Sequence, residues 1–519
     1  MFVPLTPIRC LYRAVDLYPK KTGVVCGDRR FSYAEFGERC ERLAAGLVDA
    51  GIQPGDRVAY LSFNTHELLE GYFGVPLARA IVMPLNVRLA PAELAGILQH
   101  SQPRLVIFEP DFAPLIEQLH DLCPLAISTG PAYEELLSHG RVTRPDIFSF
   151  DEAAPCELFY TSGSTGTPKG VALSHRTLYL HALSVAAVLA PDDTGIELHT
   201  IPLFHANGWG LPHAATLNGQ RHVMVRRFEP PHVLRLVQEE NATFMALVPT
   251  MANALLQCPD LPNYDLSSLR KIMLGGAASS SELVERLEKA FHCTVQAGYG
   301  LTETSPVAAL SRDKSTVPYS GDQDRWRRCS MTGWPAPACE VRVVDLHMDD
   351  VPRDMQSVGE VVVRGDIVMD GYYKDPVATA AVMSGGWLRT GDMAVWDEEN
   401  YIQIVDRQKD IIVSGGENIS SLEVERAIAA HPAVFECAVV SAPDPHWGEV
   451  PAAFIALKPG GTLNEQELCD FLAGRIARFK MPRRFHFVRE PLPKTGTGKI
   501  VKRQLREVFW AGKHHRVQG

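Results

Sequence analysis

Paired cysteines and long apolar runs are both missing from this sequence of 519 residues. Its 11 cysteines are scattered, with no C-x-x-C pair and no metal-ligand spacing, which argues against a disulfide framework and a structural zinc site. No apolar run reaches transmembrane length, and Arg9, Arg13 and Asp16 interrupt the apolar core that a signal peptide would need. We therefore expect a cytoplasmic protein without a transmembrane segment.

An excess of positive charge is missing too. The sequence contains 51 Lys and Arg against 61 Asp and Glu, a net charge of −10, which disfavours nucleic acid as a partner. Its 46% hydrophobic and 22% charged residues are typical of a globular protein, neither disordered nor fibrous. At about 150 residues per domain, a chain of this length predicts about three folding units.

The first hundred or so residues alternate short β-rich runs with helical patterns, which is typical of a doubly wound parallel α/β sheet. Strands are predicted at 58–61, 80–83, 105–108 and 158–161. Between residues 33 and 50 one apolar helical face is predicted by the spacing of Phe36, Cys40, Leu43 and Leu47. The strand at 158–161 places the next segment at the carboxyl edge of a sheet, where open α/β sheets bind ligands.

That next segment, TSGSTGTPKG at 161–170, combines three glycines and five hydroxyl residues with one lysine. Glycines let main-chain N–H groups approach an anion, hydroxyls add donors and Lys169 adds charge, so the segment predicts a phosphate-binding loop. It is not a Walker A loop, because Lys169 follows Pro168 and has no adjacent hydroxyl residue. Taken alone, the composition also fits a surface turn. The predicted phosphate-binding residues are Thr161, Ser162, Gly163, Ser164, Thr165, Gly166 and Lys169.

The C-terminal part of the chain has a different pattern. Residues 339–364 alternate in a β-rich manner, and a break is expected near Lys409. Beyond it, Ser420 and Glu423 have the spacing of a capping box ahead of a helix at 422–430. With strands predicted at 438–441 and 453–457, this tail is interpreted as a separate small α+β domain.

Four further motifs follow the loop in order. They read GYGLTE at 298–303, LRTGD at 388–392, DRQKDIIVSGGENISSLEVE at 406–425 and PKTGTGKI at 493–500. With the loop, they closely resemble the adenylate-forming (AMP-binding) superfamily, in its acyl-CoA synthetase or fatty-acid–CoA ligase branch. The resemblance implies an α/β fold: a large N-terminal domain at 1–408, made of doubly wound sheets with a small β-barrel at about 335–405, and a mobile α+β domain at 409–519 with its hinge at Lys409.

The resemblance also implies an activity. Enzymes of this family use ATP and Mg²⁺ to convert a carboxylic acid into an acyl-adenylate with release of pyrophosphate, and CoA then displaces AMP. We therefore expect an acid–thiol ligase that acts on a fatty acid of medium to long chain. The alternatives are an aryl or short-chain acid–CoA ligase, an enzyme that loads a carrier-protein phosphopantetheine, and an inactive binding protein. A homodimer is also an open alternative.

Catalytic roles are implied residue by residue. By resemblance, Lys499 bridges the carboxylate and the phosphate, Thr302 donates to the α-phosphate, and Glu303 binds magnesium. His205 and Trp209 resemble residues that line the acyl tunnel, with core packing as the alternative.

Binding roles are carried over in the same way. The implied nucleotide-binding residues are Gly275, Gly276, Ala277, Tyr299, Gly300, Asp392 and Arg407. For Asp392 and Arg407, a surface salt bridge is the alternative. The implied CoA-binding residues are Gly415, Gly416 and Trp447, with Phe479, Lys480 and Arg483 as weaker matches. Segment 317–328, VPYSGDQDRWRR, is expected to be a solvated loop, with a specificity loop as the alternative.

Overall fold

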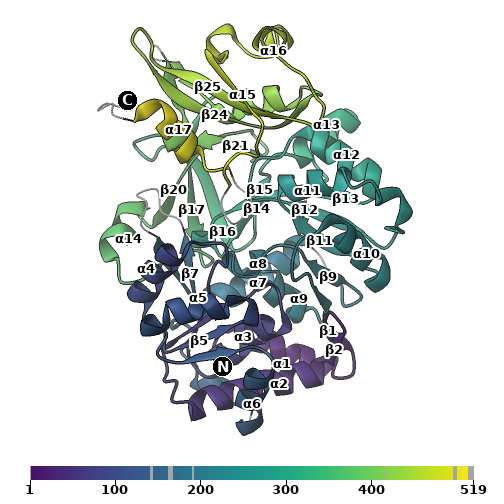
Figure 1. Ribbon diagram of the computed structural model, residues 1–519, viewed down its shortest axis with the longest axis vertical. Coiled ribbons are helices and arrows are strands. Elements are labelled where there is room, and N and C mark those ends of the chain that lie inside the picture. The colour runs from purple at the N-terminus through teal and green to yellow at the C-terminus, as the bar shows by residue number, and fades with distance from the viewer. Residues whose placement is uncertain are drawn as a thin grey trace. The chain divides into compact units, whose positions relative to one another are not determined.

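The computed structural model describes residues 2–140, 144–161, 168–189, 192–414, 417–494 and 500–511 (Figure 1). The chain divides into two compact units, one of Met1–Val341 and Val363–Arg389 and the other of Arg342–Val362 and Thr390–Gly519. The predicted domain boundary between residues 408 and 409 is also the predicted hinge. A hinge is tested only by comparing two conformations, so this boundary stays a prediction. Along the described ranges, no helix combines the length and the apolar character that crossing a membrane requires.

One sheet of the first unit has seven strands. The central strand β3 pairs in parallel with β4 and β5, while β8 turns back antiparallel to β7. In hydrogen-bonded order the strands are β18 (Gly371–Tyr372), β8 (Lys169–Ser174), β7 (Pro155–Thr161), β4 (Ile81–Pro84), β3 (Arg57–Leu61), β5 (Leu105–Phe108) and β6 (Ala126–Ser128). The predicted strands at 58–61, 80–83, 105–108 and 158–161 all lie in this sheet.

The second sheet of this unit has nine strands. Parallel pairing runs from β9 to β13, and the antiparallel strand β14 follows the turn after β13. Their order is β15 (Trp334–Pro335), β14 (Val307–Leu310), β13 (Thr294–Gly300), β12 (Lys271–Leu274), β11 (Phe244–Leu247), β9 (Ile196–His199), β10 (Arg221–Met224), β1 (Thr22–Cys26) and β2 (Arg29–Ser32).

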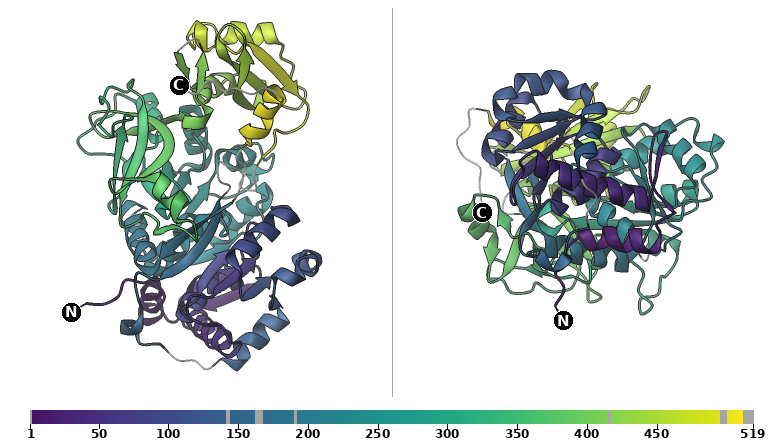
Figure 2. Two further views of the ribbon diagram at one scale, coloured as in Figure 1. Left: turned by 90° about the vertical axis from the view of Figure 1, so that its left-hand side faces the viewer. Right: turned by 90° about the horizontal axis from the view of Figure 1, so that it is seen from below.

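Helices cover both faces of these sheets (Figure 2). The helices of the first unit are α1 (Ile8–Leu17), α2 (Tyr33–Asp49), α3 (His66–Leu77), α4 (Pro91–Ser101), α5 (Ala113–Gln118), α6 (Pro131–His139), α7 (His175–Leu189), α8 (Ala206–Trp209), α9 (Leu211–Leu217), α10 (Pro230–Glu240), α11 (Pro249–Leu256), α12 (Ser281–Phe291), α13 (Asp322–Cys329) and α14 (Pro376–Val382).

Strand β3 shows how the two faces are separated. Val58 and Tyr60 pack with residues of α2, α3 and α6, whereas Ala59 and Leu61 pack with residues of α4 and α5. Successive strand residues point to opposite faces, so a strand that is apolar throughout is buried on both sides. The doubly wound arrangement predicted from the sequence is confirmed.

Helix α2 matches the helix predicted between residues 33 and 50. Ser32 and Glu35 form a capping box at its start, in which each side chain bonds the backbone N–H of the other residue. All four residues of the predicted apolar face are fully buried, namely Phe36, Cys40, Leu43 and Leu47.

The predicted loop at 317–328 is wrong in its second half, which forms helix α13. Trp326 and Cys329 are buried in the core beside α12. Trp326 Nε1 donates to Glu288 of α12 at 2.9 Å, and Arg325 forms an ion pair with the same carboxylate. Arg325 and Trp326 therefore attach this helix to α12.

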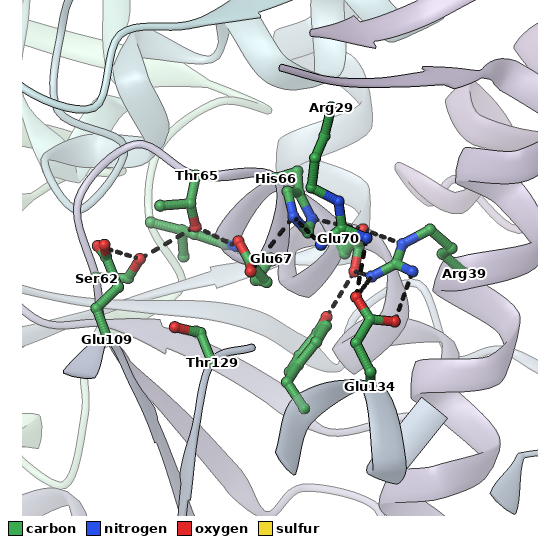
Figure 3. A network of polar contacts seen from close by, with 12 residues as sticks. Arg29, Arg39, Ser62, Thr65, His66, Glu67, Glu70, Glu109, Thr129 and Glu134 are labelled. Atoms are coloured by element: carbon green, nitrogen blue, oxygen red, sulfur yellow. Dashed lines mark hydrogen bonds and ion pairs between the residues drawn. The ribbon is translucent and has the colours of Figure 1, made fainter. Parts of the chain in front are cut away.

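A network of buried charges joins α2, α3 and α6 (Figure 3). Arg39 lies 2.6 Å from Glu70 and 2.9 Å from Glu134, while His66 Nδ1 lies 3.0 Å from Glu70. Arg29 extends the network to the surface through Glu134 at 3.0 Å. The network ties together three helices that are separated along the chain.

The second unit contains most of a five-stranded sheet and a separate C-terminal sheet. The first lies where the small barrel is predicted, with the order β16 (Cys339–Val344), β17 (Gly359–Gly365), β20 (Trp387–Trp396), β19 (Met383–Ser384), and β21 (Ile402–Arg407) on β20. The second has the order β23 (Glu417–Ile419), β22 (Ile412–Ser414), β25 (Gly448–Leu457), β24 (Val434–Asp444), with β26 (Arg484–Val488) beside β25. Its helices are α15 (Ser421–Ala429), α16 (Glu465–Leu472) and α17 (Lys502–Trp510).

The capping box predicted at the start of α15 is only half formed. The Ser420 hydroxyl accepts from the Glu423 N–H at 3.1 Å. The Glu423 carboxylate instead binds the ammonium group of Lys480 at 2.7 Å. Lys480 therefore binds the carboxylate that would otherwise complete the capping box.

Candidate active site

The end of the phosphate-loop segment lies beside the predicted magnesium ligand. Lys169 opens strand β8, and its Nζ lies 4.8 Å from the centre of the Tyr372 ring. The Tyr372 hydroxyl donates to Glu303 Oε1 at 2.9 Å. Burial and the negative charge of Glu303 raise the pKa of Tyr372, so the phenol stays protonated as a donor.

Tyr372 is a candidate site residue that the sequence motifs did not indicate. It comes from β18, which pairs antiparallel with β8 through Tyr372 and Val171. Its only local signal is the pair of tyrosines in DGYYKD, which no quoted motif contains. The residue links Lys169 and Glu303 because the sheet places a late, short strand beside the phosphate-loop strand.

The GYGLTE motif spans the end of β13 and a single turn of 3₁₀-helix at Thr302–Thr304. A Cβ atom on Gly300 would lie 1.5 Å from the Pro306 carbonyl oxygen, so only glycine fits. The Thr304 hydroxyl donates to that same oxygen at 2.6 Å, and it also accepts from the Leu301 N–H at 3.0 Å. Thr304, another residue outside the predictions, therefore fixes the turn that presents Glu303.

The LGGAAS segment follows β12, the parallel neighbour of β13, at the same edge of the sheet. Gly275 is buried, Gly276 is partly exposed with φ of 75°, and Ala277 is exposed. Both motif segments thus occupy the carboxyl ends of adjacent parallel strands, where this class of fold binds ligands.

Trp209 reaches this edge from α8, a single left-handed turn directly before α9. Its side chain is 6% exposed and belongs to an apolar cluster with Ile201, Phe244 and Val248. A Cβ atom on Gly275 would lie 2.9 Å from Cη2 of Trp209, so the indole ring packs directly on that glycine. The two alternatives for Trp209 are not exclusive, since the ring is packed in a core that borders the site.

His205 precedes the same turn and is half-buried. Its backbone N–H donates to the Pro202 carbonyl at 3.0 Å, and its own carbonyl accepts from the Gly208 N–H at 3.2 Å. The backbone of His205 is therefore anchored at the start of the segment that carries Trp209.

Within the second unit, the structure brings Asp392 and Arg407 together. They are register partners in the β20–β21 ladder, and Arg407 Nε lies 2.5 Å from Asp392 Oδ1. Asp392 is buried. An acceptor and a donor thus stand side by side, as hydroxyl recognition requires, although they also form the alternative ion pair.

Lys409 follows this ladder, and its neighbours are held by α17. Arg506 forms an ion pair with the buried Asp410. Lys502 lies 2.8 Å from Glu425 and donates to Ser421 Oγ at 2.6 Å. These contacts attach α17 to Asp410, directly after the predicted hinge, and to helix α15.

The residues that the resemblance implies for CoA binding differ in their exposure and in their contacts. Trp447 is 39% exposed, and the guanidinium carbon of Arg483 lies 5.3 Å from its ring centre. Phe479 is 44% exposed, whereas Lys480 is bound to Glu423. Trp447 and Arg483 therefore form an accessible aromatic and cationic pair.

Several predicted site residues lie outside the described residues. They are Ser162, Gly163, Ser164, Thr165, Gly166, Gly415, Gly416 and Lys499. Their roles rest on the sequence motifs.

Comparison with family models decides the family. Residues 11–373 match the AMP-binding enzyme model, and residues 423–499 match the model of the AMP-binding enzyme C-terminal domain. The chain belongs to the AMP-binding enzyme family.

Relatives of this AMP-binding enzyme are named as ligases of several acids. The long-chain-fatty-acid–CoA ligase of Thermus thermophilus is 38% identical over 96% of this chain and 94% of its own length. The peroxisomal butyrate–CoA ligase of Arabidopsis thaliana is 35% identical, over 98% of this chain and 93% of its own. The feruloyl-CoA synthase of an Amycolatopsis species is 37% identical, over 96% and 98%.

Solved structures agree with this assignment. An anthranilate–CoA ligase in complex with anthranoyl-AMP is similar with a TM-score of 0.90 and 27% identity, over 98% of each chain. ATP-bound MatB from Rhodopseudomonas palustris has a TM-score of 0.86 and 27% identity, over 97% of this chain and 99% of that one. The predicted family, fold class and enzyme class, an AMP-forming acid–thiol ligase that uses ATP and CoA, are confirmed.

Proposed function

We propose that this AMP-binding enzyme is a fatty-acyl-CoA synthetase that activates an acid of medium to long chain. The observation that supports this most is the arrangement of Lys169, Tyr372 and Glu303 at the sheet edge where the phosphate loop ends. A cation and a carboxylate on either side of one phenol suit a nucleotide whose phosphates carry a metal ion. The relative named as a long-chain-fatty-acid–CoA ligase adds support for the acid.

The chemistry requires two anions to approach each other. A carboxylate must attack the α-phosphate in line with the leaving pyrophosphate, so cations and hydrogen-bond donors must face the charge that develops. In the proposal, Lys169 and the loop 161–166 hold the phosphates, Thr302 donates to the α-phosphate, and Lys499 bridges it to the carboxylate.

The residues fit a magnesium ion that is held jointly with the nucleotide. Mg²⁺ is usually bound by one or two carboxylates together with substrate phosphates, and Glu303 supplies a carboxylate. In the part of the chain that the structure describes, no group of three His, Cys, Asp or Glu could hold a metal by itself. When bound, Mg²⁺ would neutralise phosphate charge during the transfer.

The proposal for an apolar acid rests on the surroundings of Gly275. Trp209 packs on this glycine and belongs to an apolar cluster with Phe244, Val248 and Met273. Transfer of an aliphatic chain from water to such a surface is favourable. A charged group there would need a partner.

The remaining roles belong to the same proposal. Asp392 and Arg407 would bind the ribose hydroxyls, and Lys409 would act as the hinge. Trp447 with Arg483, and Gly415 with Gly416, would serve CoA. We further propose Mg²⁺ as the metal, a cytoplasmic location, and a homodimer as a testable assembly.

The direct test is incubation of the purified protein with MgATP and butyrate, octanoate, palmitate or benzoate, with and without CoA. Pyrophosphate and thioester are both measured. Thioester from octanoate or palmitate only with CoA is the expected result. Preference for benzoate or butyrate would overturn the acid class, and pyrophosphate release without thioester would point to a carrier protein.

A variant pair tests the role of Lys499. Lys499→Ala should largely abolish pyrophosphate release, yet leave thioester formation from supplied acyl-adenylate mostly intact. Lys494→Ala is the matched control, because Lys494 lies in the same motif and forms an ion pair with Glu436 at 2.5 Å. Equal loss of both half-reactions in Lys499→Ala would contradict the assigned role.

A further inference from the structure

The turn that carries Trp209 has an unusual backbone. Five consecutive residues, Ala206, Asn207, Gly208, Trp209 and Gly210, have φ values of 45°, 43°, 54°, 65° and 78°. L residues rarely adopt this left-handed region, and a run of them persists only where the surroundings determine it. Something must therefore hold this turn against relaxation.

One side of the turn is held by close packing. A Cβ atom on Gly210 would lie 2.2 Å from Cε1 of His181, so α7 leaves room only for glycine there. His181 itself is anchored, because its Nε2 accepts from the Val307 N–H at 3.0 Å. Packing explains Gly210, but it does not explain the left-handed Asn207.

Asn207 is held by a buried carboxyl group. Its side chain has no exposed area, and Nδ2 donates to Glu157 Oε2 at 2.9 Å. Glu157 is also fully buried, on strand β7 four residues before Thr161. Its other oxygen, Oε1, lies 3.4 Å from Nε2 of His213 on α9. The three side chains join the phosphate-loop strand, the left-handed turn and the following helix.

The protons of this cluster can be assigned. Burial raises the pKa of Glu157 to about 8, although the bond from Asn207 opposes this, and burial lowers the pKa of His213 to about 3. At pH 7 both groups are therefore neutral and do not form an ion pair. The Glu157 hydroxyl can then donate to His213 Nε2 while its carbonyl oxygen accepts from Asn207.

The contacts that are present favour this assignment. Within the described ranges, Glu157 Oε1 and His213 Nε2 are both buried and neither has a recorded hydrogen-bond partner, although they face each other at 3.4 Å, so a proton on Glu157 would satisfy both atoms. A neutral imidazole has one donor and one acceptor nitrogen, so the tautomer that is protonated on Nδ1 lets Nε2 of His213 accept from Glu157. The titratable groups that face Glu157 or His213 are uncharged at pH 7 as well: Tyr72, Cys156, His175, His181 and His222.

We propose that Glu157, Asn207 and His213 form a hydrogen-bonded clasp that positions Trp209 in the acyl site. The inference rests on the proposed function, because it treats the surface beside Gly275 as the place where the acyl chain binds. Glu157 is a positioning residue: it acts through the turn and does not contact substrate. The clasp works only while Glu157 keeps its proton, since a carboxylate could not donate to His213.

Two variants separate the clasp from general packing. Glu157→Gln keeps a donor for His213 and an acceptor for Asn207, so the KM for octanoate should stay within about twofold of wild type. Glu157→Leu has similar volume but leaves both partners unpaired, and it should raise that KM by about tenfold with the KM for ATP nearly unchanged.

Glu197→Leu is the matched control. Glu197 is a buried strand carboxyl of the other sheet whose pKa is likewise raised by burial. It should not change the KM for octanoate relative to the KM for ATP. The clasp is overturned if Glu157→Gln behaves like Glu157→Leu, or if Glu197→Leu has the same acid-selective effect.

A second readout does not depend on activity. The readout is acrylamide quenching of tryptophan fluorescence. The contribution of Trp209 is the difference in fluorescence between each protein and the same protein with Trp209→Phe. Trp209 should be poorly quenched in wild type and Glu157→Gln, and at least twofold more in Glu157→Leu. If no acid yields thioester, the proposed function fails, whereas quenching still tests the clasp.

The proton assignment has its own test. It does not use Glu157→Leu, so it still applies if that variant does not fold. Between pH 7 and 9.5, quenching of Trp209 should rise in wild type as Glu157 ionises. It should stay flat in Glu157→Gln. Equal pH dependence of the two proteins would overturn the role of the proton.

Discussion

Glu70 and Glu157 are both completely buried in the first unit, yet they have opposite charge states. For Glu70, burial alone would raise the pKa, but His66 and Arg39 lower it below its usual range (Figure 3). For Glu157, burial dominates, and the pKa rises to about 8 with only the bond from Asn207 opposing. The partners therefore differ in one respect: both carboxyl groups lie beside a buried imidazole, but only Glu70 also has a guanidinium, which is always cationic, whereas the amide of Asn207 is neutral.

The difference corresponds to two uses of a buried carboxyl group. The charged Glu70 binds α2, α3 and α6 together, far along the sequence from the motifs of the site. The neutral Glu157 contacts the turn that carries Trp209. A carboxylate needs a fixed cation, which suits a permanent scaffold, while a protonated carboxyl group can act as a donor and can lose that ability as the pH rises.

The largest expected effect comes from removing the cation of the charged network. Arg39→Met should lower the free energy of unfolding by about 3–5 kcal/mol, because it leaves the Glu70 charge buried without its guanidinium. Urea unfolding measures the change. Arg42→Met is the control on the same helix, since its pair with Glu38 is exposed, and it should cost less than about 0.5 kcal/mol.

The double variant Arg39→Met/Glu70→Gln sharpens this prediction. Removing the stranded charge as well should recover part of the lost stability. If the double variant is less stable than Arg39→Met, the burial of an unpaired charge is not the cause of the loss.

The next effect is a difference in pH dependence. The native-state pKa of Glu157 is raised, so its contribution to stability is fully present below about pH 4.5 and is lost as the pH rises through about 8. Between pH 5 and 7, wild type should lose about 2–3 kcal/mol relative to Glu157→Gln. Urea unfolding at each pH measures this, and a constant difference would show that Glu157 is already ionised. For Glu70 the sign is opposite: its contribution is lost as the pH falls.

A smaller difference in stability is expected between losing a hydrogen bond to a charged acceptor and losing one to a neutral acceptor. The Tyr133 hydroxyl donates to Glu70 Oε2 at 2.8 Å, and the Tyr72 hydroxyl donates to the Leu203 carbonyl at 2.6 Å. Tyr133→Phe should cost about 2 kcal/mol and Tyr72→Phe about 1 kcal/mol, because hydrogen bonds to charged groups are the stronger ones. The free energies of unfolding of the two variants test this, and a reversed order would place the charge elsewhere.

The sequence predicted what is local and missed what the fold brings together. Glu303 and Lys169 could be predicted as site residues because their motifs are contiguous, and α2 was predicted correctly because its apolar period is regular. Tyr372 lies 69 residues from Glu303, and Asn207 lies 50 residues from Glu157, so no spacing rule connects either pair. Segment 317–328 was misassigned because its charges suggested solvent, whereas Glu288 on another helix supplies their partner.

The smallest expected effect lies at the edge of the charged network. Arg29 is 45% exposed and pairs with Glu134, which is 40% exposed, so water screens their attraction. Arg29→Met should cost less than about 1 kcal/mol, and the cost should shrink further in about 0.5 M salt, where exposed charges are screened. A loss comparable to that of Arg39→Met would mean that the network is stabilised as one unit, and that burial of the individual ion pair does not set its strength.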